Sequence, residues 1–221
     1  MIDFARQLQL DLYKKVKAQD SAVLEMERRA INWAVIITFT GLHDHYGFGR
    51  GRFRKIMDIY DRMPDIHETD IHKWEFELKP LGYDAAKVTR MCEAMARKLC
   101  KRKKGTNMKE QSKKCMAATL TLMFHTLQKE FGFSKIRITG LFEAVSINAY
   151  VLAKGEVSIW EFMKMLQLQC DITYEDLEEH ERDFGEVEIL LKPVYVSGGV
   201  RNDSERVPEP HQASVLRGEA G

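Results

Sequence analysis

The chain has 221 residues, of which 44% are hydrophobic and 30% are charged, and its formal net charge is +1. This is an ordinary globular composition, and the length allows one domain or two small ones. The longest apolar run, residues 33–39, is far too short for a membrane span, and residues 1–15 lack an apolar signal core, so we expect a cytoplasmic protein without a membrane partner.

The first predicted helix is amphipathic and the second is apolar on all sides. Residues 3–18 carry apolar side chains at helical spacing along one stripe. Asp20 or Ser21 can cap the next helix, which runs to about His45. Because its central residues 33–39 are apolar all round, we expect this helix to lie among other helices.

A glycine turn and a second amphipathic helix follow. Gly47 suits a helix C-terminus, because glycine adopts positive φ without strain. Phe53, Ile56 and Met57 then give a buried stripe, and Pro64 ends the helix.

Two further helices complete the first half of the chain. Pro80 shortens the helix that contains Trp74. The next helix begins at Asp84, and Val88 and Cys92 mark its buried face.

The second half repeats the first. Residues 34–60 align without a gap on residues 119–145, with five identities in 27 positions, whereas roughly one or two are expected by chance. The identical pairs are Phe39/Phe124, Leu42/Leu127, Gly47/Gly132, Phe48/Phe133 and Arg52/Arg137. One residue of drift later, Trp74-Glu75-Phe76 meets Trp160-Glu161-Phe162. We expect the repeated tryptophan to anchor the core in both halves.

The helices of the second half have their own start and stop signals. Residues 115–131 repeat the central helix, and the helix after Gly132 loosens over 148–155. Ser158 and Glu161 form a capping box for the third helix, and we expect Thr173 and Asp176 to do the same for the fourth. The predicted fold is therefore all-α.

We predict an internally duplicated helical bundle, with two pseudo-symmetric four-helix units. The predicted segments are an N-terminal amphipathic helix (1–20), repeat unit 1 (21–104), repeat unit 2 (105–185), and an extended arm with a disordered tail (186–221). A pseudo-two-fold would pack helix 22–46 against helix 115–131.

The repeated turns also carry a family resemblance. The segments TLQKEFGFSKIRITGLFEAV and GLHDHYGFGRGRFRKIMDIY share the pattern TLxxEFGFGxxRxxxLFEA. This pattern resembles small helical proteins of phages and prophages in Gram-positive bacteria, most of which have no characterised activity. The resemblance covers only part of each unit, and Ser134 stands where the pattern has its last glycine. It implies a mobile-element setting in a bacterial host cell and no particular reaction.

Clustered Lys and Arg residues are the candidate nucleic-acid contacts, because each neutralised phosphate releases counterions. Residues 97–114 hold nine Lys or Arg against one Glu, and the turn 47–55 with its repeat 132–137 adds cations at two helix starts. The candidate residues are Arg50, Arg52, Arg54, Lys55, Lys101, Arg102, Lys103, Lys104, Lys135 and Arg137. The leading hypothesis is a non-enzymatic protein that binds nucleic acid or a nucleoprotein complex.

An acidic segment supports different hypotheses. Residues 171–188 hold nine Asp or Glu against one Arg. The basic stretch 97–114 can be a linker docked on this segment. Alternatively, Glu175, Asp176, Glu178 and Glu179 can mimic nucleic acid in an anti-CRISPR-like inhibitor of a bacterial defence nuclease. A virion structural or assembly protein is a third alternative.

No pattern indicates a reaction or a cofactor. His43 and His45 stand two apart on a helix and point in different directions, so we expect no metal site. The four cysteines show no CxxC spacing and are expected to be free thiols, with Cys115, next to Lys113 and Lys114, the most activated. We expect no enzyme and no cofactor.

Overall fold

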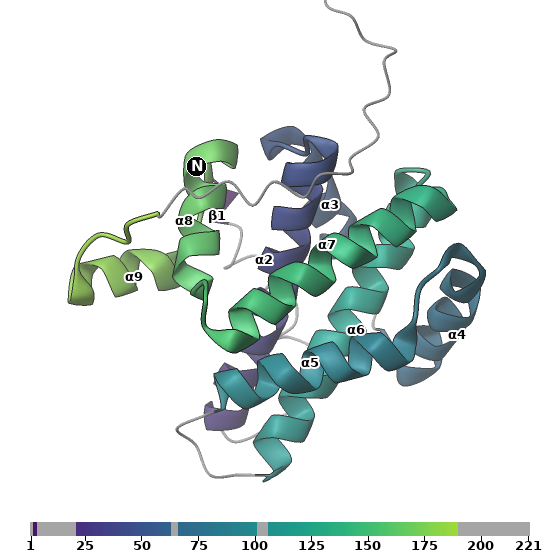
Figure 1. The fold of residues 1–221 in the computed structure, drawn as a ribbon, viewed down its shortest axis with the longest axis horizontal. Coiled ribbons are helices and arrows are strands. Elements are labelled where there is room, and N and C mark those ends of the chain that lie inside the picture. The colour runs from purple at the N-terminus through teal and green to yellow at the C-terminus, as the bar shows by residue number, and fades with distance from the viewer. Residues whose placement is uncertain (1, 4–20, 63–65, 101–105, 190–221) are drawn as a thin grey trace, which may run out of the picture. The chain divides into compact units, whose positions relative to one another are not determined.

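Helices make up almost all of the computed structural model, which describes residues 2–3, 21–62, 66–100 and 106–189 (Figure 1). Eight α-helices occupy this part of the chain, so the all-α prediction is confirmed. A short parallel pair of strands accompanies them, β1 (Ile2–Asp3) and β2 (Ile172–Thr173). Asp3 therefore begins no helix, and the rest of the predicted N-terminal helix lies outside the described residues, as does the tail from residue 190.

Two long helices form the centre of the bundle. Helix α2 (Ser21–Tyr46) and helix α6 (Thr106–Glu130) make the most extensive contact in the structure, as their apolar sequences predicted. Phe39 of α2 and Phe124 of α6 are almost completely buried. Helix α6 begins well before residue 115, so most of the predicted linker is helical.

Both central helices end in the same kind of turn. Gly47 and Gly132 have φ of +60° and +63°. Just beyond them, the Phe48 N–H donates to the Leu42 carbonyl at 3.2 Å, and the Phe133 N–H donates to the Leu127 carbonyl at 3.1 Å. The two phenylalanines are buried, and each turn leads directly into the next helix.

The helices that follow the turns differ in length. Helix α3 (Arg50–Asp61) buries Phe53, Ile56 and Met57, as predicted. Helix α7 (Lys135–Lys154) continues through Asn148 to a C-cap at Gly155, so the prediction that it loosens over 148–155 was wrong. The Asn148 side chain donates to the Ile37 carbonyl of α2 at 3.0 Å, and this contact between helices holds the last turns of α7 in place.

Helix α7 is long and apolar enough, by length and composition, to cross a membrane. In the structure its Ile138, Leu141 and Val145 are buried in the core, where α7 packs against α2 and against α5 (Ala85–Leu99). Figure 1 shows α7 running across α2. Burial in the core accounts for part of the apolar composition of α7, whose Ile136 and Tyr150 are exposed.

The shorter helices begin and end largely where the sequence indicated. Helix α4 (Glu68–Leu78) stops before Pro80, in a 3-10 turn (Lys79–Leu81), and Asp84 caps α5 by accepting from the Lys87 N–H at 3.0 Å. Helix α8 (Ile159–Cys170) has the predicted capping box, in which the Glu161 N–H donates to Ser158 Oγ at 3.2 Å.

Helix α9 (Glu175–Phe184) lacks the predicted capping box. Tyr174 is its N-cap, and Thr173 lies in strand β2. The Asp176 carboxylate instead pairs with Arg28 of α2 at 2.8 Å. This pair with a distant helix replaces the local cap that the sequence suggested.

The two halves of the chain interlock. Helix α4 of the first half packs on α6 of the second, and α8 of the second half packs on α2 of the first. One apolar core runs through both halves, and all the described residues belong to a single compact unit that ends at Leu190.

The repeated tryptophans have different partners. Trp74 stacks on His125 of α6, with ring centroids 4.8 Å apart, whereas Trp160 stacks on His180 of α9 at 4.3 Å. The neighbouring Phe162 is buried, but Phe76 is 80% exposed. The prediction that both tryptophans anchor the core therefore holds for Trp160, which packs against the core cluster, and not for Trp74, which stacks on His125.

Candidate functional site

The starts of α3 and α7 lie beside each other. We call residues 46–55 and 131–137 the paired helix starts. The rings of Phe48 and Phe133 meet with centroids 6.0 Å apart. Tyr46 packs on Phe133 at 5.2 Å, and Phe131 packs on Phe48 at 5.5 Å. Two basic turns that are far apart in the sequence thus share one aromatic cluster.

Three exposed cations lie on the rings of this cluster. The Arg52 guanidinium lies 5.0 Å from the centroid of Phe48, and the Arg137 guanidinium lies 5.8 Å from that of Phe133. The Lys55 ammonium lies 5.0 Å from the ring of Phe131. Each such contact contributes on the order of 0.5–1 kcal/mol at an exposed site. The rings therefore restrain the cations while leaving them open to solvent.

Hydrogen bonds restrain the same elements. The Tyr46 hydroxyl donates to the Arg137 carbonyl at 2.9 Å, which ties the end of α2 to the first turn of α7. Arg52 also donates to the Tyr46 carbonyl at 3.2 Å. Burial raises the pKa of Tyr46 above its ordinary value, so its hydroxyl keeps the proton that it donates at neutral pH.

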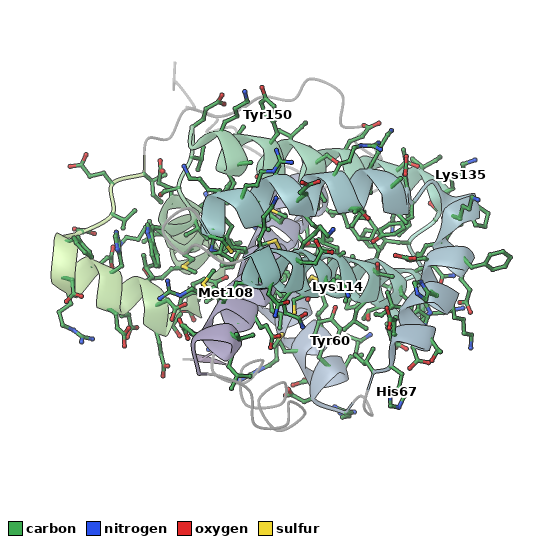
Figure 2. All side chains as sticks on the ribbon, turned by 90° about the horizontal axis from the view of Figure 1, so that it is seen from below. Tyr60, His67, Met108, Lys114, Lys135 and Tyr150 are labelled. Atoms are coloured by element: carbon green, nitrogen blue, oxygen red, sulfur yellow. The ribbon has the colours of Figure 1, made fainter. Side chains whose placement is uncertain are left out.

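The remaining cations of the paired helix starts are also exposed. Arg54 and Lys135 point away from the core, and Figure 2 shows Lys135 projecting at one end of the molecule. Arg50 pairs with Asp171, the residue that ends α8. Both partners of this pair are largely exposed, so it is weak and can exchange for another anion.

The two helix N-termini lack side-chain caps. Gly49 has no side chain to act as a cap, the Ser134 side chain accepts no hydrogen bond from its helix, and neither first turn contains an acidic residue. Cations in a first turn oppose the helix dipole, whereas an anion there would be stabilised. The local electrostatics of both helix starts thus favour an anionic partner.

The basic stretch 97–114 is different. Lys101, Arg102, Lys103 and Lys104 lie outside the described residues. Arg97 and Lys109 both pair with Glu93, at 2.5 and 3.5 Å, and Lys113 pairs with Glu110 at 2.7 Å. Two carboxylates of α5 and α6 therefore partly neutralise these three cations. Among the described cations of the stretch, Arg97 on α5 and Lys114 on α6 are exposed, and Lys114 is labelled in Figure 2.

The acidic segment is partly neutralised by other helices. Besides the Asp176–Arg28 pair, Lys164 of α8 pairs with Glu181 at 2.8 Å and with Glu186 at 3.2 Å. The hydrogen bond from Lys164 holds the pKa of Glu181 below its usual value. Of the four predicted protein contacts, Glu175, Glu178 and Glu179 are exposed, whereas Asp176 is partly buried in its ion pair.

One cysteine–histidine contact was not foreseen from the sequence. Cys170 Sγ lies 3.3 Å from His43 Nδ1, and that nitrogen lies 2.9 Å from the Phe48 carbonyl. A carbonyl only accepts, so Nδ1 carries a proton and has no lone pair for the thiol. Burial, together with the charge of Asp44, raises the pKa of Cys170 to about 11. This geometry keeps the thiol protonated.

Cys115 is not activated by its lysine neighbours. Burial, together with the charge of Glu27, raises the pKa of its thiol to about 12, which is opposite to the predicted direction. Within residues 2–3, 21–62, 66–100 and 106–189, no three His, Cys, Asp or Glu side chains group to hold a metal ion.

Sequence analysis found the cations of the paired helix starts but not that the two starts meet. A signal was available, because Tyr46 aligns on Phe131 and Phe48 on Phe133 in the sequence, and aromatic rings gain energy when they pack against each other. Comparisons with protein families, with curated proteins and with solved structures give no match, so function must be argued from the geometry of this site.

Proposed function

We propose that this chain is a non-enzymatic binding protein that engages the phosphate backbone of nucleic acid through the paired helix starts. The observation that carries the proposal is the aromatic cluster with Arg52, Lys55 and Arg137 on its rings. Arginine suits phosphate, because its planar fork makes two parallel hydrogen bonds. The resemblance to phage proteins supports an activity in a bacterial host cell.

We further propose that the two halves are copies related by a pseudo-two-fold axis. The reciprocal ring contacts support this relation, because Tyr46 meets Phe133 as Phe131 meets Phe48. Helix α4 of the first half packs on α6, and helix α8 of the second half packs on α2, so these contacts have the same symmetry. In this proposal residues 21–104 and 105–185 are repeat units that share one core.

The test is a titration with fluorescently labelled DNA and RNA at about 50 and about 200 mM salt. If the paired helix starts contact phosphates, affinity should fall by orders of magnitude over this range. Arg52→Ala/Arg137→Ala should remove two contacts and reduce the log–log salt slope by about 1.8. A salt-insensitive signal, or no binding at all, would contradict the proposal.

Lys154→Ala/Arg182→Ala is the matched control. It removes the same charge from exposed positions, and Lys154 lies on the ring of Tyr150 at 5.5 Å, the same kind of contact that Arg137 makes. Lys154 is 17 residues beyond Arg137 on α7, or about 26 Å along the helix. Figure 2 shows Tyr150 well away from Lys135. The control should bind like wild type.

A second variant separates the two basic surfaces. Lys101→Ala/Arg102→Ala/Lys103→Ala/Lys104→Ala removes four charges from the basic stretch and leaves the paired helix starts intact. If only this variant loses binding, the interface is the 97–114 stretch and the proposal for the paired helix starts fails.

A second candidate function is inhibition of a bacterial defence nuclease by α9. Glu178 and Glu179 are exposed on α9, and the ring of Phe184 on the same helix is 78% exposed, so the helix offers charge and apolar surface together. Glu178→Lys/Glu179→Lys should abolish inhibition, and Glu68→Lys/Glu156→Lys, exposed on other elements, should not. Asp176 is left unchanged because it anchors α9 to Arg28.

A further inference from the structure

The contacts at the paired helix starts are reciprocal, which limits what can bind there. We propose that the ligand is an antiparallel nucleic-acid duplex whose own two-fold axis coincides with the pseudo-two-fold between Phe48 and Phe133. Arg52 and Arg137 then contact phosphates of opposite strands. This inference rests on the proposed function and names its ligand.

The first step is the symmetry of the site itself. Phe48 and Phe133 are equivalent positions, and they contact each other, as residues beside a two-fold axis do. Tyr46 and Phe131 flank them with exchanged partners. The axis therefore passes through the aromatic cluster.

The second step is the symmetry of the cations. Arg52 and Arg137 are identical residues at equivalent positions, and each lies on the phenylalanine of its own turn, at 5.0 and 5.8 Å. Arg50 and Lys135 extend the match by one more cation on each side. Arg54 and Lys55 are the exceptions, because Thr139 and Gly140 stand at their equivalent positions. The two sides thus offer two matched cations each.

The third step is strand polarity. A single strand runs in one direction, so it cannot present the same geometry to two protein elements that a two-fold relates. The two strands of a duplex run in opposite directions and are themselves related by two-fold axes, as in operators whose palindromes mirror protein dimers. Equivalent arginines can therefore make equivalent contacts only with a duplex.

The dimensions agree with this assignment. Arg52 lies 5.0 Å from the Phe48 centroid, the two centroids are 6.0 Å apart, and Arg137 lies 5.8 Å from the Phe133 centroid. The two guanidiniums are thus at most about 17 Å apart, and this upper limit is compatible with contacts to the backbones on both sides of a B-DNA groove, whose widths are about 6 and about 12 Å. No ring inserts between bases in this arrangement, since both phenylalanines are buried.

The experiment compares ligands and then arginines, using the full chain. Fluorescence anisotropy would measure binding to duplex DNA of about 20 base pairs, to either of its single strands, and to duplex RNA of the same sequence, over a range of salt. We expect at least one duplex to bind at least tenfold more tightly than the single strands, with one protein per site. The two duplex arms tell DNA from RNA.

Arg52→Ala and Arg137→Ala should weaken duplex binding by the same factor, within about twofold, and each should reduce the salt slope by about 0.9. Lys154→Ala should change neither. Arg52→Lys and Arg137→Lys keep the charge and should restore most of the slope, which excludes loss of folding as the cause.

Two results would overturn the inference. One is single-strand binding as tight as duplex binding; the other is an effect carried by one arginine alone. If single strands bind tightly and the double alanine variant loses that binding, the duplex inference fails while the proposed function survives. If no nucleic acid binds, both fail.

Discussion

The two glycine turns offer a direct measurement of backbone strain. Gly47 and Gly132 have φ near +60°, and a Cβ added to either would meet no atom within 4 Å. Alanine at these sites therefore costs only the left-handed conformation, about 1–2 kcal/mol. It also restricts the unfolded chain, which returns about 0.4–1 kcal/mol. The net loss should be about 1 kcal/mol for Gly47→Ala and the same for Gly132→Ala.

Urea denaturation, followed by the circular dichroism of the helices, measures these losses of stability. Alanine variants of two other glycines serve as references, one with a smaller and one with a larger expected cost. Gly51→Ala, at an open helical position of α3, should stabilise the protein by about 0.5 kcal/mol. Gly82→Ala should cost more than either turn variant, because its Cβ would lie 2.5 Å from Thr139 Oγ1 at a φ of +94°. Losses at the two turns that differ by more than about 1 kcal/mol would refute the reasoning, since no side-chain contact distinguishes the sites.

Three further outcomes are expected. Ser158→Ala should lower the free energy of unfolding by about 1 kcal/mol through loss of the α8 cap, whereas Ser134→Ala, at an N-cap without a side-chain hydrogen bond, should cost less than about 0.5; equal costs in urea titrations would contradict this. Burial lowers the pKa of His125 below 6.5, so the folded protein binds fewer protons than the unfolded chain and stability should fall as pH falls through 6.5. His125→Gln should remove most of that slope between about pH 7.5 and 5.5, and a slope that persists would point to another group. Cys115 and Cys170 have thiol pKa values of about 12 and about 11, so they should react with iodoacetamide at least a hundredfold more slowly than an ordinary cysteine. Labelling can be mapped by mass spectrometry, and rapid labelling of either cysteine would show that its thiol is not held protonated by burial.

Features that depend on neighbours in the sequence were predictable. The turn at Gly47, the capping box of Ser158 and the helix stop at Pro80 all appear where the local signals placed them. Each reflects a conformational preference or a hydrogen bond within a few residues, which the sequence itself displays.

Features that depend on contacts between helices were not predictable in the same way. From the sequence alone, Asn148 suggests the end of a helix, but in the structure its amide donates to the Ile37 carbonyl and the helix continues. Asp176 likewise suggests a helix cap, but in the structure it pairs with Arg28. The candidate site belongs to this class. The sequence shows two basic turns, but only the ring contacts between these turns place Arg52 and Arg137 around one aromatic cluster.

Helix α4 packs on the central helix of the second half, and α8 packs on that of the first half, so the two halves of the chain should depend on each other for folding. Each central helix relies on a helix from the other half to cover part of its apolar surface, and α5 completes the cover of α6 and α7. A fragment that ends near residue 100 and one that begins near residue 106 would each leave such a surface open to water. Apart, neither should form a stable fold; mixed, the two should assemble into the native bundle, as complementing fragments do.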